Sequence, residues 1–339
     1  MGYTILKNIK SISPDEWRYV STLNYFNFFQ GLTFLEFIER QGYKTLFVAI
    51  KRNDKIVAMV SAVIYKEKGI KSFFSKRAII YGGPVYHDDI KQEDIEVLLT
   101  SLVASIGNKA IYLEIRNFND YDRFKKIYEL HKFKYQAHLN FHLDCSDENE
   151  IKKNISKSKL RYIKKSLKNG AMITEANSEA DIAQFYNALE NLYRLKVKTP
   201  LPEIDFFMQL YRNNVAKFIL VTYNDKVIGG TVLANLNNDI VYEWYVCGRD
   251  RKYKDIHPSI LATWGAINYA NSIGATRFDF MGAGSPDKEY GVREFKSKFG
   301  GELVEHGRFI HIINPLLFTL GKMAVSMLKS KTPVVRLSN

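Results

Sequence analysis

Two stretches of this chain repeat the same order of apolar and polar residues. The first, LFVAIKRNDKIVAMVSAVI, starts at Leu46, and the second, FILVTYNDKVIGGTVLANL, starts at Phe218. Each consists of a β-rich apolar run, an Asn-Asp-Lys turn and a second apolar run, and an Asn-Asp step favours the left-handed backbone of tight hairpins. The pattern therefore predicts two β-hairpins with Asp54 and Asp225 at equivalent turn positions.

The likeness between the two halves continues beyond these hairpins. In the first half YGGPV is followed by the helical pattern DIEVLLTSLVASIG and the strand pattern AIYLEIR, and in the second half YEWYVCG is followed by PSILATWGAINYANSIG and TRFDFMG. Both helical patterns place apolar residues three and four positions apart and end at a glycine, and Pro258 suits a first helical position. We predict an internal duplication that produces two α/β domains, residues 1–150 and residues 151–339.

The stretch that joins the two predicted domains is strongly basic. Residues 151–168 predict one helix that begins the second domain, with apolar residues on one face. Lysines gather on another face: Lys153, Lys157, Lys164 and Lys168. Because like charges on one helix face repel one another, this face favours a phosphate-bearing partner over plain solvent exposure.

A second helix is predicted at the end of the chain. Residues 316–328 are mostly apolar, and the basic residues Lys329, Lys331 and Arg336 follow them. The segment is too short to span a bilayer. It either caps the core or lies in a membrane interface.

Composition narrows the class of partner. The 339 residues are 46% hydrophobic and 14% aromatic, enough for sizeable cores, and 49 Lys and Arg against 36 Asp and Glu give a net charge of +13. This surplus fits RNA, nucleotide-linked substrates or anionic lipid, although a lysine-rich soluble surface also produces it. The two cysteines, Cys145 and Cys247, suit a reducing cytosol. The first residues lack a long apolar run, so we expect no secretory signal.

One segment, residues 278–301, carries the candidate chemistry. The sequence has no GxSxG, HExxH, Walker or strand-linked GxGxxG motif, so we expect neither serine nor metal catalysis. Within FDFMGAGSPDKEYGVREFKSKFGG, Gly282 and Gly284 would let a substrate approach the main chain, where free N–H groups could hold an oxyanion. Lys296 could stabilise negative charge on a carbonyl oxygen, although this pattern alone also describes a surface lysine beside core phenylalanines.

These segments, in this order, resemble the Fem family of peptidoglycan-bridge aminoacyltransferases and related single-domain acyltransferases. FDFMGAG followed by FKSKFGG is similar to the family's strand, loop and FKxxFG, and LRYIKKSLKNGAMI is similar to its basic segment before a glycine. YGGPV is similar to RGPV, and YEWYVCG with HPSILATWGAINYA to its tyrosine strand and proline-started helix. The resemblance covers nearly the whole chain. It implies an α/β (α+β) fold of two tandem GNAT-like acyltransferase domains, the first on the acceptor side and the second for acyl transfer.

The resemblance also assigns roles to residues. Lys296 matches the lysine that stabilises the tetrahedral oxyanion, and Phe295 lines the site. Tyr245 matches a substrate-contacting tyrosine, and Arg161 or a neighbouring lysine such as Lys164 matches a phosphate contact. Asp279 is a candidate general base or a structural strand residue.

Two positions in the first domain depart from the family pattern. Gly82 stands where RGPV has an arginine, and His87 stands where an acidic residue often follows. These departures put the acceptor contacts of the first domain in doubt.

The donor is predicted from the segment GRDRKYKDIHPS. It has one early glycine, Gly248, and no compact glycine loop of the kind that holds the pyrophosphate of coenzyme A. Its basic residues suit an extended polyanion. We therefore expect a charged tRNA as donor, with acyl-CoA or an acyl carrier as alternatives, and no cofactor.

The sequence thus predicts a cytoplasmic, amide-forming N-acyltransferase. Its expected acceptor is a nucleotide- or lipid-linked peptidoglycan precursor or another envelope or small-molecule amine, with peripheral contact at the inner membrane. The alternative is a non-catalytic module that binds RNA or anionic membrane.

Overall fold

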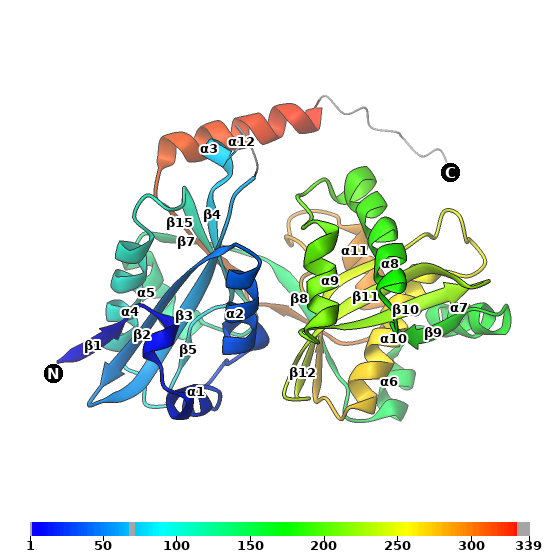
Figure 1. Cartoon of the computed structure of the whole chain (residues 1–339), viewed down its shortest axis with the longest axis horizontal. Helices are drawn as coiled ribbons and strands as arrows, with labels where there is room; N and C mark the ends of the chain where they lie inside the picture. The colour runs from blue at the N-terminus through cyan, green and yellow to red at the C-terminus, as the bar shows by residue number, and fades with distance from the viewer. Residues whose placement is uncertain (1, 68–71, 331–339) are drawn as a thin grey trace. The chain divides into compact units, whose positions relative to one another are not determined.

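The computed structural model of this chain describes residues 2–67 and 72–330, which form two units (Figure 1). Unit 1 comprises Met1–Gln136 with Gly307–Asn339, and unit 2 comprises Ala137–His306. Each unit has its own mixed β-sheet and its own hydrophobic core. The predicted α/β fold with two domains is confirmed. Lys331 and Arg336 lie outside the described residues.

Unit 1 combines one sheet with helices that pack on it. Its strands are β1 (Tyr3–Leu6), β2 (Lys44–Arg52), β3 (Lys55–Tyr65), β4 (Arg77–Gly82), β5 (Val85–Tyr86), β6 (Tyr112–Asn117), β7 (Phe133–Gln136) and β15 (Arg308–Ile312). Its α-helices are α1 (Pro14–Val20), α2 (Leu32–Arg40), α3 (Ser72–Ser75), α4 (Gln92–Ile106), α5 (Lys125–Leu130) and α12 (Pro315–Ser330).

Unit 2 has the same kind of architecture. Its strands are β8 (Leu139–Asp144), β9 (Met172–Glu175), β10 (Lys217–Tyr223), β11 (Lys226–Leu236), β12 (Ile240–Gly248), β13 (Arg277–Asp279) and β14 (Glu302–Glu305). Its α-helices are α6 (Glu148–Asn154), α7 (Lys157–Lys168), α8 (Glu179–Leu192), α9 (Ile204–Arg212), α10 (Pro258–Ser272) and α11 (Gly291–Ser297).

The two sheets have matching strand orders, which confirms the predicted duplication. Unit 1 follows the order β1-β2-β3-β4-β6-β15-β7, and unit 2, read from the corresponding edge, follows β9-β10-β11-β12-β13-β8-β14. Both contain one parallel pair among antiparallel ones, β4 with β6 and β12 with β13. The helices that connect these parallel strands, α4 and α10, each have 15 residues.

The two predicted hairpins also match in their turns. Asn53 and Asp54 have φ angles of 52° and 59°, and Asn224 and Asp225 have φ angles of 48° and 56°. Two successive positive φ angles are the geometry of a tight hairpin, and Asn and Asp tolerate them better than most residues. The predicted equivalence of Asp54 and Asp225 is therefore confirmed.

Two strands are exchanged between the units, and this corrects the predicted boundary at residue 150. β8 follows β7 in sequence but pairs with β13 and β14, whereas β15 pairs with β6 and β7. Residues 137–150 therefore belong to unit 2. The C-terminal helix predicted at 316–328 is present as α12, but in unit 1 rather than in the second domain. The alternation of apolar and polar residues in a short strand fits either sheet, so the sequence of the strand does not predict this exchange.

The predicted single basic helix at 151–168 is two helices. α6 ends at Asn154, and the backbone of Ser156 is extended. The Ser156 side chain accepts a hydrogen bond from the Lys159 N–H at 3.4 Å. Serine is a favoured residue at the start of a helix because its side chain satisfies an otherwise unbonded N–H. The serine therefore begins α7 and interrupts the helix that periodicity alone predicts.

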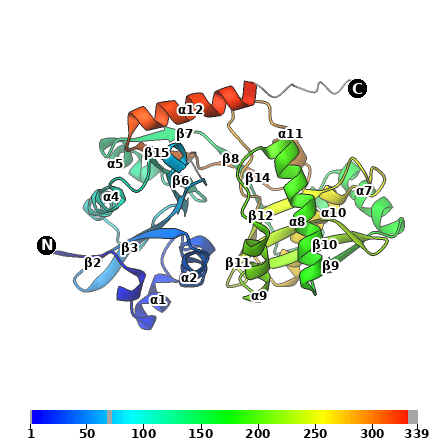
Figure 2. The ribbon, with the colours of Figure 1, turned by 45° about the horizontal axis from the view of Figure 1, so that its top comes forward.

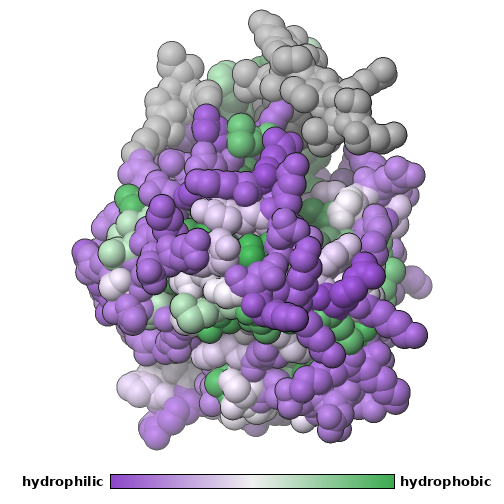
Figure 3. Space-filling model, turned by 90° about the vertical axis from the view of Figure 1, so that its right-hand side faces the viewer, coloured by the Kyte–Doolittle hydropathy of each residue, from purple (hydrophilic) through white to green (hydrophobic). Residues whose placement is uncertain are grey.

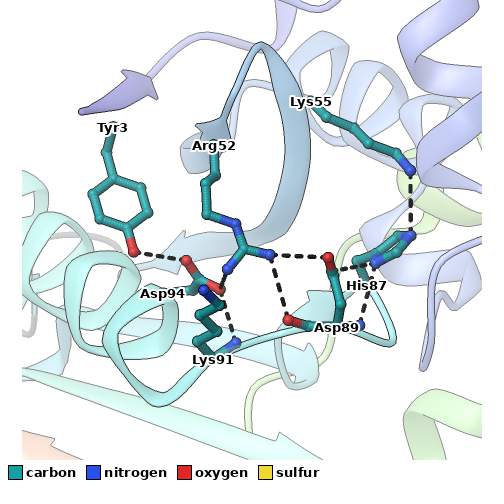
Figure 4. Close-up of polar contacts among 7 residues, drawn as sticks. All are labelled: Tyr3, Arg52, Lys55, His87, Asp89, Lys91 and Asp94. Carbon is teal, nitrogen blue, oxygen red and sulfur yellow. Dashed lines mark hydrogen bonds and ion pairs between the residues drawn. The ribbon is translucent and has the colours of Figure 1, made fainter. Parts of the chain in front are cut away.

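A network of hydrogen bonds and ion pairs around the buried Arg52 and Asp94 connects the first strand of unit 1 to its neighbours (Figure 4). The Arg52 guanidinium donates to the Asp94 carboxylate at 2.9 Å and lies 3.1 Å from Asp89. The Tyr3 hydroxyl and the Lys91 N–H also donate to Asp94, at 2.7 Å and 2.8 Å. These contacts join β1, the β2–β3 hairpin and α4. Because each buried charge has opposite-charge partners, we interpret the network as structural.

Candidate active site

The parallel strands of unit 2 separate early, and their separation frames the candidate site. β12 and β13 pair over only three residue pairs, which end at Tyr242 and Asp279. Beyond this point the register of β12 with β11 steps from Glu243 to Tyr245, so Trp244 forms a β-bulge. Bulges redirect side chains and are common beside active sites.

The loop that follows β13 has a backbone that requires small residues. Met281, Gly282 and Gly284 have φ angles of 59°, 112° and 79°. The Asn140 side chain of β8 holds this loop, since its Nδ2 donates to Asp279 and its Oδ1 accepts from the Gly282 N–H, both at 2.7 Å. The glycines predicted from the sequence therefore have a conformational role here.

The N–H groups at the start of this loop are already bonded, which corrects the expectation that they are free. Met281 donates to the Asp279 carboxylate at 2.7 Å, and Gly282 donates to Asn140. Ala283 donates to a carbonyl of β8 at 2.6 Å. The acceptors include residues of β8, more than 130 positions earlier in the chain, so the local motif gave no sign of them. An oxyanion role cannot rest on these three groups.

Asp279 anchors this loop. It is fully buried, and its second carboxylate oxygen lies 3.1 Å from Nε2 of His142. Burial acts to raise the pKa of Asp279, but hydrogen bonds and the charge of His142 outweigh it, so the pKa lies below its ordinary value. A carboxylate with this many partners favours the structural interpretation of Asp279 over that of a general base.

Lys296 reaches the loop from α11. Its side chain is 7% exposed, and its ammonium donates to the carbonyl of Phe280 and, at 2.9 Å, to that of Gly282. Burial lowers its pKa, against the opposing charges of Glu243 and Asp279. An ammonium carries three N–H donors, so one remains for another acceptor. The structure therefore holds one directed positive charge beside the end of β13.

Glu243 is a functional candidate that sequence reasoning missed. It is 3% exposed on β12, and it is the acid whose charge most strongly supports the ammonium of Lys296. One of its oxygens accepts from the Thr263 hydroxyl at 2.8 Å, and the other has no hydrogen-bond partner among the described residues. Burial raises its pKa. A glutamate within the otherwise apolar strand YEWYVCG was the available signal.

Tyr245, the predicted substrate-contacting tyrosine, lies in an aromatic cluster further along β12. Its ring centroid is 5.1 Å from that of Phe207, 5.3 Å from that of Trp244 and 6.4 Å from that of Tyr193. The π-helical segment Tyr193–Val197 continues α8 at this point. Such segments are frequent at functional sites, because they displace side chains from regular helical positions.

The predicted phosphate contacts and the residues of α11 are not brought together directly. Arg161 and Lys164 are exposed on α7, whereas Lys159 of the same helix is 6% exposed and turns inward. The Lys159 ammonium lies 3.8 Å from the ring centre of Phe295 and 5.0 Å from that of Phe299. Phe295 thus contacts Lys159, and through this contact α7 meets α11.

Lys159 has an unusual environment for a buried cation. No acid of the described chain lies within ion-pair distance of its ammonium, although Asp250 and Glu294 act on it from further away. Burial, reinforced by the charge of Lys298, lowers the pKa of Lys159 to about 8. Sequence reasoning counted only the exposed lysines of this helix and missed it.

A basic surface covers α7 and the loop that precedes α10. Its exposed residues are Lys157, Arg161, Lys164, Lys165, Lys168, Arg251, Lys252 and Lys254. An ion pair between Lys165 of α7 and Asp255 of the loop, at 2.8 Å, connects the two. The side of the molecule on which α7 lies in Figure 1 is largely hydrophilic (Figure 3). Concentrated positive charge of this kind suits a polyanion.

The N-terminus of α10 already holds a carboxylate. Asp250 accepts hydrogen bonds from the Ser259 N–H at 3.1 Å and from the Ser259 hydroxyl. Gly248 packs against the same turn, because a Cβ there would lie 2.3 Å from the Ser259 nitrogen. Helix N-termini attract phosphate through free N–H groups and the helix dipole. Asp250 thus takes up the Ser259 N–H at this helix N-terminus.

Comparison with known proteins gives a family match for the segment that carries the site. Residues 208–326, which include β12, α10, β13 and α11, match the FemAB family. This segment is similar to the FemAB family and contains Lys296 and Glu243. The resemblance inferred from the sequence motifs is thereby confirmed. No curated protein matches the chain significantly.

Solved structures support the same fold. The chain is 15% identical to FemX with a TM-score of 0.68, covering 94% of this chain and 99% of that one. It is 7% identical to a tandem GNAT protein of the clavulanic acid biosynthesis pathway, with a TM-score of 0.57 and 91% and 98% of the two chains covered. L-PGS from Bacillus licheniformis is 10% identical, with a TM-score of 0.53 and 92% and 97% covered. The tandem GNAT-like fold predicted from the sequence is confirmed.

The described part of the chain contains no group of His, Cys, Asp and Glu side chains that could hold a metal ion. Cys145 and Cys247 are buried free thiols.

Proposed function

We propose that this protein forms amide bonds by transferring an acyl group, most simply an aminoacyl group, from an activated ester to an amine. One observation carries the proposal: Lys296, in the segment that matches the FemAB family, directs a buried ammonium to the end of β13 where the central strands separate. Two of its N–H groups are held by main-chain carbonyls, and the third is free to meet a developing oxyanion.

The reaction follows from these groups. A neutral acceptor amine attacks the ester carbonyl of the donor, and the new C–N bond places negative charge on the carbonyl oxygen, which Lys296 stabilises. Collapse of this intermediate breaks the ester C–O bond and releases the donor alcohol. Glu243, whose pKa is raised by burial and which has one oxygen without a hydrogen-bond partner, is our candidate to receive the amine proton and pass it to that alcohol.

The donor we propose is a charged tRNA. Two features support it over acyl-CoA: the N-terminus of α10 is occupied by Asp250, and the basic surface on α7 and the adjoining loop is suited to an extended polyanion. We place Arg161 and Lys164 among its phosphate contacts and Tyr245 and Phe295 among the residues that bound the substrate. No cofactor enters this reaction, because the ester itself is the activated group.

The acceptor we propose is the amine of a peptidoglycan precursor, nucleotide- or lipid-linked, recognised through unit 1 in the cytoplasm. This part of the proposal rests on the resemblance to the Fem family, and Gly82 and His87 depart from that pattern where acceptor contacts are expected.

The test is transfer itself, measured with matched donors. Purified protein is incubated with tRNA charged with a panel of labelled amino acids, or with the corresponding acyl-CoA esters, and with a muropeptide precursor. We expect a labelled amide product with a charged tRNA and none with acyl-CoA. A product from acyl-CoA alone would reject the donor while retaining acyl transfer. RNA binding without any product, from every donor and acceptor combination, would favour the non-catalytic alternative.

Glu243 is tested in the same assay. Glu243→Gln keeps the hydrogen bond to Thr263 but cannot take a proton, so we expect turnover to fall by roughly 10²-fold. Glu302→Gln, an exposed acid in the same unit, is the matched control. Equal turnover in wild type and Glu243→Gln would remove Glu243 from the mechanism.

A further inference from the structure

α12 carries an apolar stripe that is exposed among the residues that the structure describes. Leu316, Leu320 and Met323 are 79%, 51% and 51% exposed. Their spacing of four and three positions puts them on one face of the helix. The opposite side packs inward, where the Phe318 ring lies 5.3 Å from that of Tyr112. The helix is therefore anchored to unit 1 by one face and leaves the other face apolar and bare.

An exposed aromatic side chain lies beside this helix. α12 packs against α3 (Figure 1). In both ribbon views α12 runs along the edge of unit 1 (Figures 1 and 2). The approach is close, since a Cβ at Gly321 would lie 3.0 Å from the carbonyl oxygen of Phe74. Phe74 is 43% exposed. We call Phe74, Leu316, Leu320 and Met323 together the α12 patch.

The charged side chains of the segment that carries α12 have one sign. From residue 306 to the end of the chain there is no Asp or Glu, and the basic residues are Arg308, Lys322, Lys329, Lys331 and Arg336. Lys322 is exposed on the flank of α12, between the stripe and the inward side, with its ammonium 4.8 Å above the ring of Phe318. An apolar helix face in a segment whose charged residues are all cations is the pattern of helices that lie in the interface of an anionic bilayer.

We propose that the α12 patch docks this protein on an anionic lipid bilayer, with α12 lying in the plane of the headgroups. The apolar stripe would enter the boundary of the acyl chains while Lys322, on the flank of the helix, meets lipid phosphates. In the described part of the chain no helix is long and apolar enough to cross a membrane, so α12 rests on the bilayer rather than spanning it. A second copy of the chain fits this surface less well, because it would bring a net charge of +13 against the same charge.

The test measures binding to vesicles and needs no enzymatic activity, so its result is independent of the proposed function. The full chain is mixed with vesicles of phosphatidylcholine containing one third phosphatidylglycerol, or with phosphatidylcholine alone, and bound protein is measured after sedimentation. We expect binding to the anionic vesicles, at least about tenfold weaker binding to the neutral ones, and weakening with added salt.

Matched variants locate the contact. Leu316→Ser with Leu320→Ser should weaken binding to anionic vesicles at least about tenfold, because it removes the inserted apolar surface. Leu130→Ser changes a leucine of unit 1 with a similar exposure, 76%, outside the patch, and should bind as wild type does. Lys322→Gln, which leaves the apolar stripe unchanged, should reduce the dependence on salt, and thermal unfolding of each variant verifies its fold.

Several outcomes would overturn the proposal. Wild-type protein that stays in the supernatant with anionic vesicles contradicts it, and so does equal binding of the double variant. Self-association of the wild type that the double variant abolishes, without vesicle binding, would instead assign the α12 patch to an interface between copies of the chain.

Discussion

The two units share a strand order but differ where their parallel strands end. In unit 1, β4 and β6 stay paired over six residue pairs, up to Gly82 and Asn117. In unit 2 the equivalent pairing stops after three residue pairs, and β12 bulges at Trp244. Hydrogen-bonded strands leave no room for a ligand between them, whereas strands that separate do. The duplicated fold therefore supplies the same scaffold twice, and local strand separation distinguishes the unit that carries the candidate site.

The buried charged groups of the two units differ in how completely they are partnered. In unit 1, Glu114 accepts from Arg116 at 3.2 Å and from Arg308 at 2.6 Å. In unit 2, Glu243 keeps one oxygen without a hydrogen-bond partner, and Lys159 has no acid within ion-pair distance among the described residues. Buried charges with incomplete partners are costly and are commonly found at functional sites.

The largest expected effect contrasts a buried cation of each unit. Lys296→Met should lower turnover by roughly 10²–10³-fold while the protein still folds, because the transition state loses its charge partner. Its cost in stability should be about 1–3 kcal/mol, because the carbonyls of Phe280 and Gly282 lose their donor. Arg308→Met leaves Glu114 with one guanidinium, so it should lower the free energy of unfolding by about 2–3 kcal/mol while turnover of the folded protein stays close to wild type. Turnover at saturating substrates and denaturant unfolding measure the two quantities.

Lys298→Met is the control for this contrast. Lys298 lies two positions from Lys296 but is exposed and paired with Glu294 at 2.6 Å, so its loss should change turnover little. Near-normal turnover of Lys296→Met would reject the oxyanion role, and a large loss of turnover in Arg308→Met would show that unit 1 takes part in the transfer more directly than its paired charges indicate.

The next contrast predicts opposite signs of stability change at two equally buried cations. Arg52 is 7% exposed and bound to acids, whereas Lys159 is 6% exposed and is not. Arg52→Met should lower the free energy of unfolding at pH 7 by about 3 kcal/mol, since Asp94 then remains buried without its cation. Lys159→Met should raise it by about 1–3 kcal/mol, since a buried charge disappears.

The pH dependence tests the sign at Lys159. Its pKa is lowered from 10.5 in the unfolded chain to about 8 in the folded protein, so the unfolded chain holds the extra proton between these values. Wild-type stability should therefore gain a contribution as pH rises from about 8 to 10.5, and the advantage of Lys159→Met should be full below pH 8 and vanish above 10.5. Denaturant unfolding at pH 7 and pH 10.5 measures it. A Lys159→Met variant less stable than wild type at pH 7 would contradict this account.

Features set by neighbouring residues could be predicted from the sequence. The Asn-Asp turns, the apolar periodicity of α10 and the Gly-rich end of β13 are local patterns, so they indicated the duplication and the segment with Lys296. Ser156 was also local, but helical periodicity concealed it. The exchange of β8 and β15 was not predictable in this way, because a strand's own residues do not specify its partner sheet.

The missed site residues depend on contacts between distant segments. Burial raises the pKa of Glu243 against the opposing effects of Lys296 and Thr263, and Lys159 is buried by Phe295 and Phe299 of a distant segment. In the sequence, Lys159 is one of several lysines on a basic helix, and Glu243 is a single acid in a strand. Their chemistry comes from the packing that surrounds them.

A smaller effect concerns Gly82 at the end of the paired strands in unit 1. Gly82 and Gly42 have φ angles of 85° and 78°, so alanine is strained at both. At Gly82 a Cβ would also lie 2.2 Å from the Asn27 side chain, whereas at Gly42 nothing lies within 4 Å. Gly42→Ala should cost about 1 kcal/mol of unfolding free energy and Gly82→Ala about 2–3 kcal/mol. Equal losses would show that Asn27 moves freely, and the arginine of related sequences could then be accommodated at Gly82.

The smallest expected effect on the fold is at the basic surface of unit 2. If this surface binds donor phosphates, each neutralised phosphate releases counterions, so affinity falls steeply with salt. Lys164→Glu with Lys168→Glu should weaken binding of charged tRNA and reduce the slope of log affinity against log salt by about 2. Turnover at saturating donor should change less, because both lysines are exposed on α7 whereas Lys296 is buried. Lys109→Glu with Lys126→Glu makes the same change of net charge on exposed residues of unit 1 and should leave the slope near wild type. Superimposable salt series for the two double variants would mean that net charge alone governs binding, and α7 would then be ordinary solvent-exposed surface.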